Sequence, residues 1–96
     1  MEDIMRQINR IAAVVVTYNR KELLRECLQA LLAQSMNQLD ILLIDNASTD
    51  GTHEFVEDII EANDTISYIN TGSNLGGAGG FHYGLKEAYN RGYEYM

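Results

Sequence analysis

Apolar residues occur along this chain in blocks that have the length of single strands. The first block, IAAVVVTY at 11–18, is continuous and rich in β-branched residues, which is typical of a strand buried on both faces of a sheet. Similar but shorter blocks follow at 40–46 (DILLIDN) and at 65–70 (TISYIN). We therefore predict three strands at these positions.

Between these blocks, apolar residues recur every three or four positions, which is the spacing of one face of a helix. A helix is predicted within 19–34, with Asn19 as its N-cap. A second helix is predicted at 52–62, with Ser48 or Asp50 and Gly51 capping its start. The residues expected on the apolar faces of these two helices are Leu23, Leu24, Cys27, Leu28, Leu31, Leu32, Phe55, Val56, Ile59 and Ile60.

A third helix is predicted from about 80 to 91, and Gly92 fits the C′ position just beyond its end. The last four residues, YEYM at 93–96, are expected to begin a fourth strand. The residues expected on the apolar face of the third helix are Phe81, Leu85, Ala88 and Tyr89.

The predicted order of elements is β-α-β-α-β-α-β, within a single domain at 1–96. Strands that alternate with helices favour a Rossmann-like α/β fold, with a mostly parallel sheet, flanking helices and right-handed crossovers. Sheets of this kind bind ligands at the carboxyl ends of their strands. We expect the loops at 17–20, 45–50 and 72–80 to meet there.

The last of these loops contains NLGGAGGF (74–81), which has four glycines within five positions. It matches neither the GxGxxG pattern, which follows a first strand, nor the Walker A pattern. Glycines that open a helix leave backbone N–H groups free for a ligand and allow a planar ring to lie against bare backbone. The alternative is a mobile connector, although such linkers usually mix serine with their glycines.

Four residues at the predicted strand ends have side chains suited to a nucleotide. Asn46 offers a donor and an acceptor that match the edge of uracil or thymine, and Asp45 can accept from a ring N–H or a ribose hydroxyl. Both residues also fit simple turn chemistry within DNASTDG. Tyr18 can stack on a base and Arg20 can bind a phosphate, although the sequence alone favours a solvated side chain for Arg20.

Composition narrows the classes of function. The net charge of −7 argues against nucleic-acid binding, which requires a basic face, and it means that a bound diphosphate needs local donors or a bridging cation. His53 and His82 have no partners at zinc spacing and are expected to be exposed. Because the single Cys27 cannot form an internal disulfide and the sequence has neither a secretory signal nor a membrane-spanning apolar run, we expect a cytoplasmic chain.

Three motifs in the same order and register, VVVTYNR, ILLIDNASTDGT and NLGGAGGFHYGLKEA, resemble the start of family 2 glycosyltransferases of the GT-A fold. The third motif is most similar to those of galactofuranosyl- and rhamnosyltransferase-like members. The resemblance implies a partial GT-A fold that binds a UDP- or dTDP-sugar. The residues that it implies in the nucleotide-sugar site are Tyr18, Arg20, Asp45, Asn46, Asn74, Gly76 and Gly77.

In this comparison Tyr18 and Arg20 would lie beside the base and the phosphate, and Asp45 and Asn46 at the base edge. The glycines, with Asn74, would lie against the base and the ribose. Many members of the family have a second Asp where this chain has Asn46. An amide can still bond to a pyrimidine edge.

The family binds the donor diphosphate through Mn²⁺ or Mg²⁺ on an Asp-x-Asp-like motif, which would follow the strand begun by YEYM. The general base would lie further on. We therefore expect a chain truncated before these elements, with its metal ligands beyond residue 96, and with no catalytic or metal-binding residue of its own.

The resemblance implies a parent enzyme that transfers a sugar to an acceptor hydroxyl, on a glycan or a lipid-linked sugar, with inversion and metal dependence. We expect this piece alone to be inactive and to self-associate through an exposed sheet edge. Regions outside it could attach the full-length protein to a membrane. The alternative is a complete small α/β nucleotide-binding or regulatory module without catalysis, and the position of the glycines disfavours an NAD-dependent enzyme.

Overall fold

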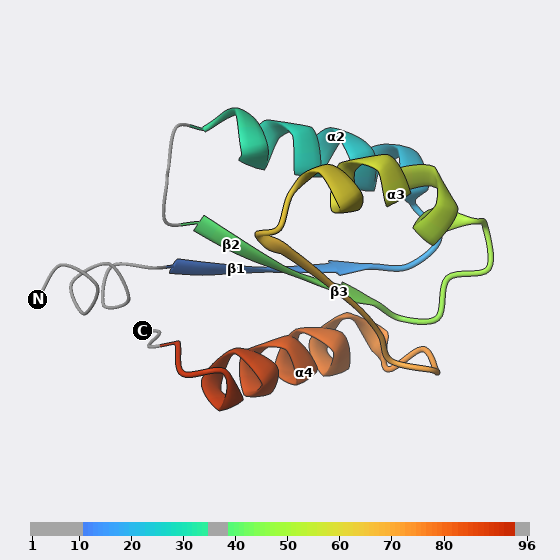
Figure 1. Ribbon diagram of the computed structural model, residues 1–96. Helices are drawn as coiled ribbons and strands as arrows, with labels where there is room; N and C mark the ends of the chain where they lie inside the picture. Colours follow the sequence, from blue (N-terminus) through green and yellow to red (C-terminus); the bar gives the residue numbers. More distant parts are fainter. Residues whose placement is uncertain (1–10, 35–38, 94–96) are drawn as a thin grey trace, which may run out of the picture.

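The computed structural model describes residues 11–34 and 39–93, and its sheet consists of three parallel strands (Figure 1). The strands are β1 (Ile11–Thr17), β2 (Leu39–Asp45) and β3 (Ile66–Asn70). β2 lies between the other two, so that Ile41 pairs with Ala13 on one side and with Ile66 on the other. The three strand predictions are confirmed to within one residue at each end.

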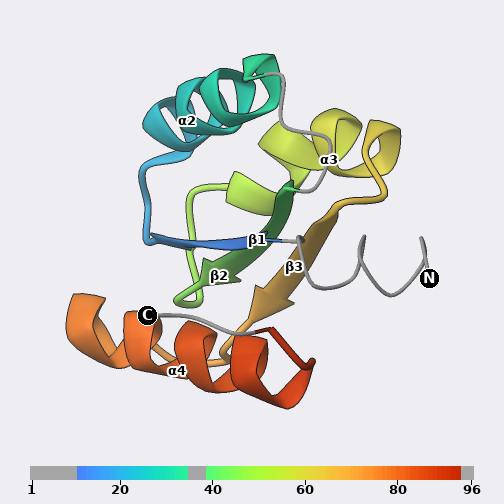
Figure 2. The ribbon, with the colours of Figure 1, turned by 90° about the vertical axis from the view of Figure 1, so that its left-hand side faces the viewer.

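Helices cover both faces of this sheet. They are α2 (Lys21–Ala33), α3 (Thr52–Ala62) and α4 (Gly76–Asn90). Figures 1 and 2 show α2 and α3 side by side on one face, and α4 alone across the other. The change of face after β3 brings α4 back against β1 and β2. The predicted Rossmann-like α/β architecture, with parallel strands and flanking helices, is confirmed for the described residues.

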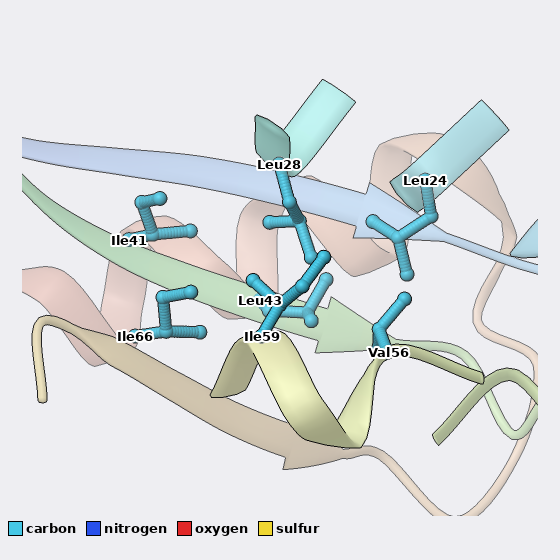
Figure 3. Packing of buried hydrophobic residues seen from close by; sticks show 7 residues of the cluster. All are labelled: Leu24, Leu28, Ile41, Leu43, Val56, Ile59 and Ile66. Carbon is cyan, nitrogen blue, oxygen red and sulfur yellow. The ribbon is translucent and has the colours of Figure 1, made fainter. Parts of the chain in front are cut away.

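The core under α2 and α3 consists of large aliphatic side chains (Figure 3). Each is a Leu, Ile or Val, and burial of one such side chain stabilises a fold by roughly 1.5–3 kcal/mol. Helical and strand periodicity bring all of them to this layer, as the sequence predicts for α2 and α3. The members of this cluster are Leu24, Leu28, Ile41, Leu43, Val56, Ile59 and Ile66.

β1 differs from the strand that its sequence predicts. Its residues from Ala12 to Val16 are only half-buried, and Ile11 is 50% exposed, so the expectation of burial on both faces is wrong. The physical reason is the order of the three described strands, in which β1 lies at an edge and β2 in the centre. In β2 every residue from Asp40 to Asp45 is buried.

α4 also differs, at its start and on its buried face. It begins at Gly76 rather than near residue 80, so most of the glycine loop is helical. On the expected apolar face, Phe81 and Tyr89 were wrong, because they are 48% and 68% exposed, whereas Leu85 is half-buried and Ala88 is buried. The residues of α4 that are buried are Gly80, Gly84 and Ala88, which recur every four positions.

These small residues let α4 lie unusually close to the sheet. A Cβ atom at Gly84 would come within 2.3 Å of Val14 Cγ1, and one at Gly80 within 2.7 Å of Val16 Cγ1. No side chain fits between the helix backbone and β1 at either position. Close packing therefore explains both glycines, whereas for Gly80 the sequence suggested open backbone for a ligand.

The helix ends show which capping predictions hold. Gly92 lies at C′ with φ of +92°, and its N–H donates to the carbonyl of Tyr89, as predicted. Asn19 does not cap α2, whose N-cap is Arg20 without a side-chain hydrogen bond. The N-cap of α3 is Gly51 with φ of +80°, and neither Ser48 nor Asp50 caps it by a side-chain bond.

The predicted fourth strand at 93–96 falls almost wholly on residues 94–96, which lie outside the described residues. Tyr93 itself follows the end of α4, and its hydroxyl donates to a carboxylate oxygen of Asp40.

In the described ranges, none of the helices combines the length and apolar character needed to cross a bilayer.

Candidate functional site

A cavity of about 540 Å³ opens at the carboxyl ends of β1 and β2, beside the first turn of α4. Every residue predicted for the nucleotide-sugar site lines it except Asp45. These residues come from segments that are far apart in the sequence, and the parallel sheet brings them to one edge. The residues lining the cavity are Val15, Val16, Thr17, Tyr18, Arg20, Leu23, Leu24, Cys27, Asn46, Asn74, Gly76 and Gly77.

Asn19 ties the loop after β1 to the loop after β2. Its backbone N–H donates to Ser48 Oγ at 2.9 Å, and its side-chain oxygen accepts from the backbone N–H of Thr49 at 2.7 Å. Lys21 adds a third link, through its Nζ and the carbonyl oxygen of Asp50 at 3.0 Å. Asn19 has a φ of +50°, which Asn tolerates better than most residues. The residues that flank it, Tyr18 and Arg20, are thereby held at the mouth of the cavity, and both are exposed.

Asp45 is 1% exposed, and both of its carboxylate oxygens are engaged. Oδ1 accepts from the backbone N–H of Ser48 at 2.9 Å, and Oδ2 accepts from the hydroxyl of Tyr68 at 2.6 Å. Burial, followed by the bond to Asp45, raises the pKa of Tyr68 to about 12, so this tyrosine remains a hydrogen-bond donor at neutral pH. Asp45 therefore shapes the loop after β2, and its contact with a ligand stays a prediction.

A second cavity, of about 480 Å³, is lined by Asp45, Tyr68, His53 and the surrounding polar residues. The ring of His53 stacks on that of Tyr68, with centroids 4.2 Å apart and planes 9° from parallel. His53 and His82 are exposed, as predicted. The tyrosine ring that stacks on His53 is therefore the one whose hydroxyl donates to Asp45.

Asn46 is next to Asp45 in sequence but has different surroundings. It is 2% exposed, lines the larger cavity, and donates from Nδ2 to the carbonyl oxygen of Gly76 at 3.0 Å. Its Oδ1 lies 3.3 Å from the hydroxyl oxygen of Thr71. The side chain thus joins the end of β2 to the first residue of α4.

The glycine loop is held by short-range hydrogen bonds. Asn74 accepts with Oδ1 from the N–H of Gly76 at 2.9 Å, and Asn70 accepts in the same way from Gly72 at 2.8 Å. Gly76 has a φ of +78°, a conformation that favours glycine. A Cβ at Gly77 would meet nothing within 4 Å, so the backbone there is open to the cavity that it lines. Such a helix start presents unpaired N–H groups.

The described residues do not form a metal centre. Within 11–34 and 39–93, no group of three or more His, Cys, Asp or Glu side chains is placed to hold a metal ion. The metal ligands that the resemblance implies would follow residue 96, so the described residues do not test that expectation. Cys27 lines the larger cavity and is half-buried on α2.

Three residues that shape the site were not identified from the sequence. Tyr68 lies inside a strand, and its partner Asp45 is 23 positions away, so no local pattern connects them. Thr71 directly follows β3, which is the position where its contact with Asn46 could have been expected. Gly80 looked like part of the open loop, but it packs against Asn46 and Val16.

Comparison with known proteins relates this geometry to a family. A family model described as Glycosyl transferase family 2 matches residues 12–95. The chain is 35% identical over 78 residues to galactofuranosyltransferase GlfT1 of Mycolicibacterium smegmatis, a match that covers 81% of the chain and 25% of that protein. It is 29% identical over 82 residues to poly-beta-1,6-N-acetyl-D-glucosamine synthase of Staphylococcus aureus, which covers 85% of the chain and 20% of the synthase.

A solved structure shows the same fold. The mannosyltransferase PcManGT from Pyrobaculum calidifontis, in complex with GDP-Man and Mn²⁺, superposes with a TM-score of 0.70 at 26% sequence identity. The match covers 88% of this chain and 24% of the mannosyltransferase. The chain therefore spans about a quarter or less of the length of each of these relatives.

Proposed function

This chain belongs to glycosyl transferase family 2, and from that membership we propose that it forms the nucleotide-binding part of an enzyme that transfers a sugar from a nucleotide-sugar donor. The observation that carries the proposal is the cavity at the carboxyl ends of β1 and β2. It gathers an aromatic ring, a guanidinium group, an amide and open glycine backbone from three separate loops. These are the groups that a base, a phosphate and a ribose require.

Each group has a role in the proposed complex. Tyr18 stacks on the base, because its ring is exposed at the mouth of the cavity. Arg20 binds a phosphate oxygen, since its charge is one of few positive charges in a chain with a net charge of −7. Asn46 contacts the base edge, and the open backbone at Gly76 and Gly77 lies against the ribose and base.

The donor and the chemistry are proposed in more detail. We propose a UDP- or dTDP-sugar as donor, and inverting transfer to a hydroxyl of a glycan or a lipid-linked sugar in the cytoplasm. The mannosyltransferase of the same fold binds GDP-Man and Mn²⁺, which supports a diphosphate donor with a divalent cation. As the resemblance to the family implies, we propose that the ligands for Mn²⁺ or Mg²⁺ lie beyond residue 96. This chain alone binds nucleotide weakly and does not catalyse transfer.

Titration of UDP into ¹⁵N-labelled protein, followed by NMR, tests the proposal. Amide shifts should change at residues 18–20, 46 and 76–78, with saturation in the millimolar range. Arg20→Ala should weaken binding by about tenfold to a hundredfold, because a charge-assisted hydrogen bond contributes about 1.5–3 kcal/mol. Arg91→Ala is a matched control, because Arg91 pairs with Glu87 and Ser67 and does not line the cavity. Shifts confined to other surfaces, or sugar transfer by the chain alone, would contradict the proposal.

We also propose that the chain self-associates through β1. The strand is half-buried along most of its length, and among the described residues it pairs with β2 alone. An edge of this kind presents a row of backbone N–H and C=O groups that another strand can pair with. Sedimentation velocity should show mass increasing with concentration, and a monomer at every concentration up to about 1 mM would rule this out.

A further inference from the structure

The outer edge of β1 has backbone groups with no partner strand among the described residues. The carbonyl oxygen of Thr17 accepts from the N–H of Asn46 at 2.9 Å, so Thr17 and every second residue before it face β2. The residues between them direct their N–H and C=O groups to the outer edge, and these residues are Ala12, Val14 and Val16. β1 therefore offers a regular row of donors and acceptors to a further strand.

Apolar side chains border this edge on the side of the sheet that α2 covers. Leu23 and Cys27 lie on one flank of α2 and line the larger cavity together with Val15. Leu23 is 58% exposed and Cys27 is half-buried. The opposite flank of α2 faces α3, where Arg25 pairs with Asp58. The flank of Leu23 and Cys27 is therefore directed toward the outer edge of β1.

α4 provides a second apolar border on the other side of the sheet. Glu87 and Arg91 pair with each other, and Arg91 reaches Ser67 on β3, so this flank of α4 faces β3. The opposite flank is nearer to β1, and the residues that recur on it every four positions are Phe81, Leu85 and Tyr89. Because Phe81 and Tyr89 are 48% and 68% exposed, this flank has apolar surface available for a partner.

The distribution of charge favours a second copy of the chain as that partner. β1 contains no charged residue, and α2 and α4 each contain as many basic as acidic residues. The helix with only acidic charges is α3, which contacts β3 rather than β1. Two copies can therefore meet along β1 without the repulsion that a net charge of −7 would cause elsewhere.

Antiparallel pairing of β1 with β1 of a second copy fits this edge. A two-fold axis through Val14 pairs Ala12 with Val16 of the second copy and uses the outer groups of both strands. α4 lies over both β1 and β2, so strands about 4.8 Å apart place the two α4 helices about 10 Å apart, a normal packing distance. Gly84 lies against Val14, so Leu85 comes close to the axis.

We propose that the outer edge of β1, with these flanks of α2 and α4, is a two-fold dimer interface that competes with nucleotide binding. Val15 and Val16 belong to this edge and also line the larger cavity. A strand paired about 4.8 Å from them takes up the part of the cavity that Leu23 and Cys27 line. The competition rests on the proposed nucleotide-binding function, whereas the interface does not.

Phe81→Glu and Tyr83→Glu are a matched pair for testing the interface. They add the same charge to opposite flanks of α4, at side chains that are 48% and 38% exposed. Phe81→Glu places like charges near the two-fold axis and should raise the dimer dissociation constant of the 96-residue chain about tenfold or more, measured by sedimentation equilibrium. Tyr83→Glu should change it less than about threefold. Equal effects of the two variants would overturn the interface.

Hydrogen exchange, followed by NMR at low and high protein concentration, tests which backbone groups pair. The amides of Ala12, Val14 and Val16 should become more protected as the concentration rises, because only the dimer gives them acceptors. The amides of Ala13 and Val15 face β2 in the monomer and should change little. Protection that rises along β3 instead, or a monomer whose own terminal residues cover β1 at every concentration, would contradict the interface.

The effect of UDP on dimerisation tests the competition. Saturating UDP should raise the dimer dissociation constant about tenfold or more, and UDP should bind less tightly as the protein concentration increases, because the coupling is reciprocal. If UDP binds and the dissociation constant is unchanged, the competition is wrong and the proposed function stands. If UDP does not bind, the proposed function and the competition fail together, and the exchange at β1 still decides the interface.

Discussion

The two faces of the sheet are covered by helices that pack in opposite ways. α2 and α3 bring branched aliphatic side chains, such as Leu28 and Val56, into a continuous layer above Leu43 (Figure 3). α4 presents Gly80, Gly84 and Ala88, and its backbone lies directly on the side chains of β1. The face under α2 and α3 is stabilised by the amount of apolar surface that it buries. The face under α4 depends on the close approach of the helix backbone to the side chains of β1. The difference shows that a glycine can be as much a packing residue as a leucine.

Removing volume from the aliphatic face should have the largest effect. Leu28 is fully buried, and Leu28→Ala should lower the free energy of unfolding by about 2–5 kcal/mol through lost burial and the cavity left behind. Leu23→Ala on the same helix is the matched control, because Leu23 is 58% exposed and should cost about 0.5 kcal/mol or less. Urea denaturation followed by circular dichroism measures the stability of both variants. Similar losses of stability in the two would contradict the assignment of Leu28, but not Leu23, to the core.

Adding a single methyl group to the α4 face should have the next largest effect. Gly84→Ala places a Cβ within 2.3 Å of Val14 Cγ1 and should cost about 1–3 kcal/mol by overpacking, even though alanine favours helices. Val14→Ala removes the clashing atoms. The double variant should therefore be more stable than the sum of the single effects predicts. Purely additive losses in urea denaturation would show that the close contact is not the cause.

The same substitution at an open position of α4 should act in the opposite direction. Gly77 lies in the first turn, and a Cβ atom there would have no neighbour within 4 Å, so Gly77→Ala should stabilise the fold by about 0.5–1 kcal/mol. Because the added methyl group projects from backbone that lines the larger cavity, UDP should bind less tightly. A variant that is destabilised, or that binds UDP more tightly, would be inconsistent with open backbone at this position.

The smallest effect should come from the ion pair that joins α2 to α3. Arg25 donates to both carboxylate oxygens of Asp58 at 2.8 Å, and this hydrogen bonding lowers the pKa of Asp58 to about 2. A lowered pKa in the folded state means that the pair stabilises the fold above about pH 4 and that this contribution is lost as the pH falls to about 2.

Asp58→Asn should therefore lower the unfolding midpoint slightly at pH 7, and the difference from the native chain should vanish near pH 2. Glu61→Gln, at another exposed position of α3, controls for the change in net charge. Urea midpoints measured across this pH range test the claim, and a difference that grows on acidification would have the wrong sign.

Hydrophobic periodicity predicted most of the aliphatic face, although Leu23 and Phe55, which it also placed there, are 58% and 38% exposed. It predicted the three strands, the bounds of α3 and the buried residues of α2 that meet Leu43, because large side chains mark a buried face directly in the sequence. It failed for α4, where the buried residues are two glycines and an alanine, and Phe81 and Tyr89 point away from the core. Helix propensity also argued against a helix starting at Gly76, and tertiary packing overrides that preference.

The site was predictable in its location but not in its detail. Motif order and strand ends indicated where Tyr18, Arg20 and Asn46 meet, because parallel strands bring successive loops to one edge. The sequence could not distinguish Asp45 from Asn46, since adjacent residues at a strand end point in different directions. Asp45 is held by Tyr68, and Asn46 by Gly76, through contacts more than 20 positions apart. Likewise, the strand order that leaves β1 at an edge is not encoded in any one segment.

The parallel pairing of the strands also constrains how this chain acquires its structure. Ile11 pairs with Leu39 and Ile41 with Ile66, so every strand contact joins residues at least 25 positions apart, and no hairpin can form first. Any folding route must close a whole β-α-β crossover before the sheet yields its first stabilising contacts, and loop closure of this kind slows folding. During synthesis, β1 and α2 leave the ribosome before β1 has a strand to pair with. The interval until β2 emerges is the period in which the apolar run of β1 is most exposed to other chains.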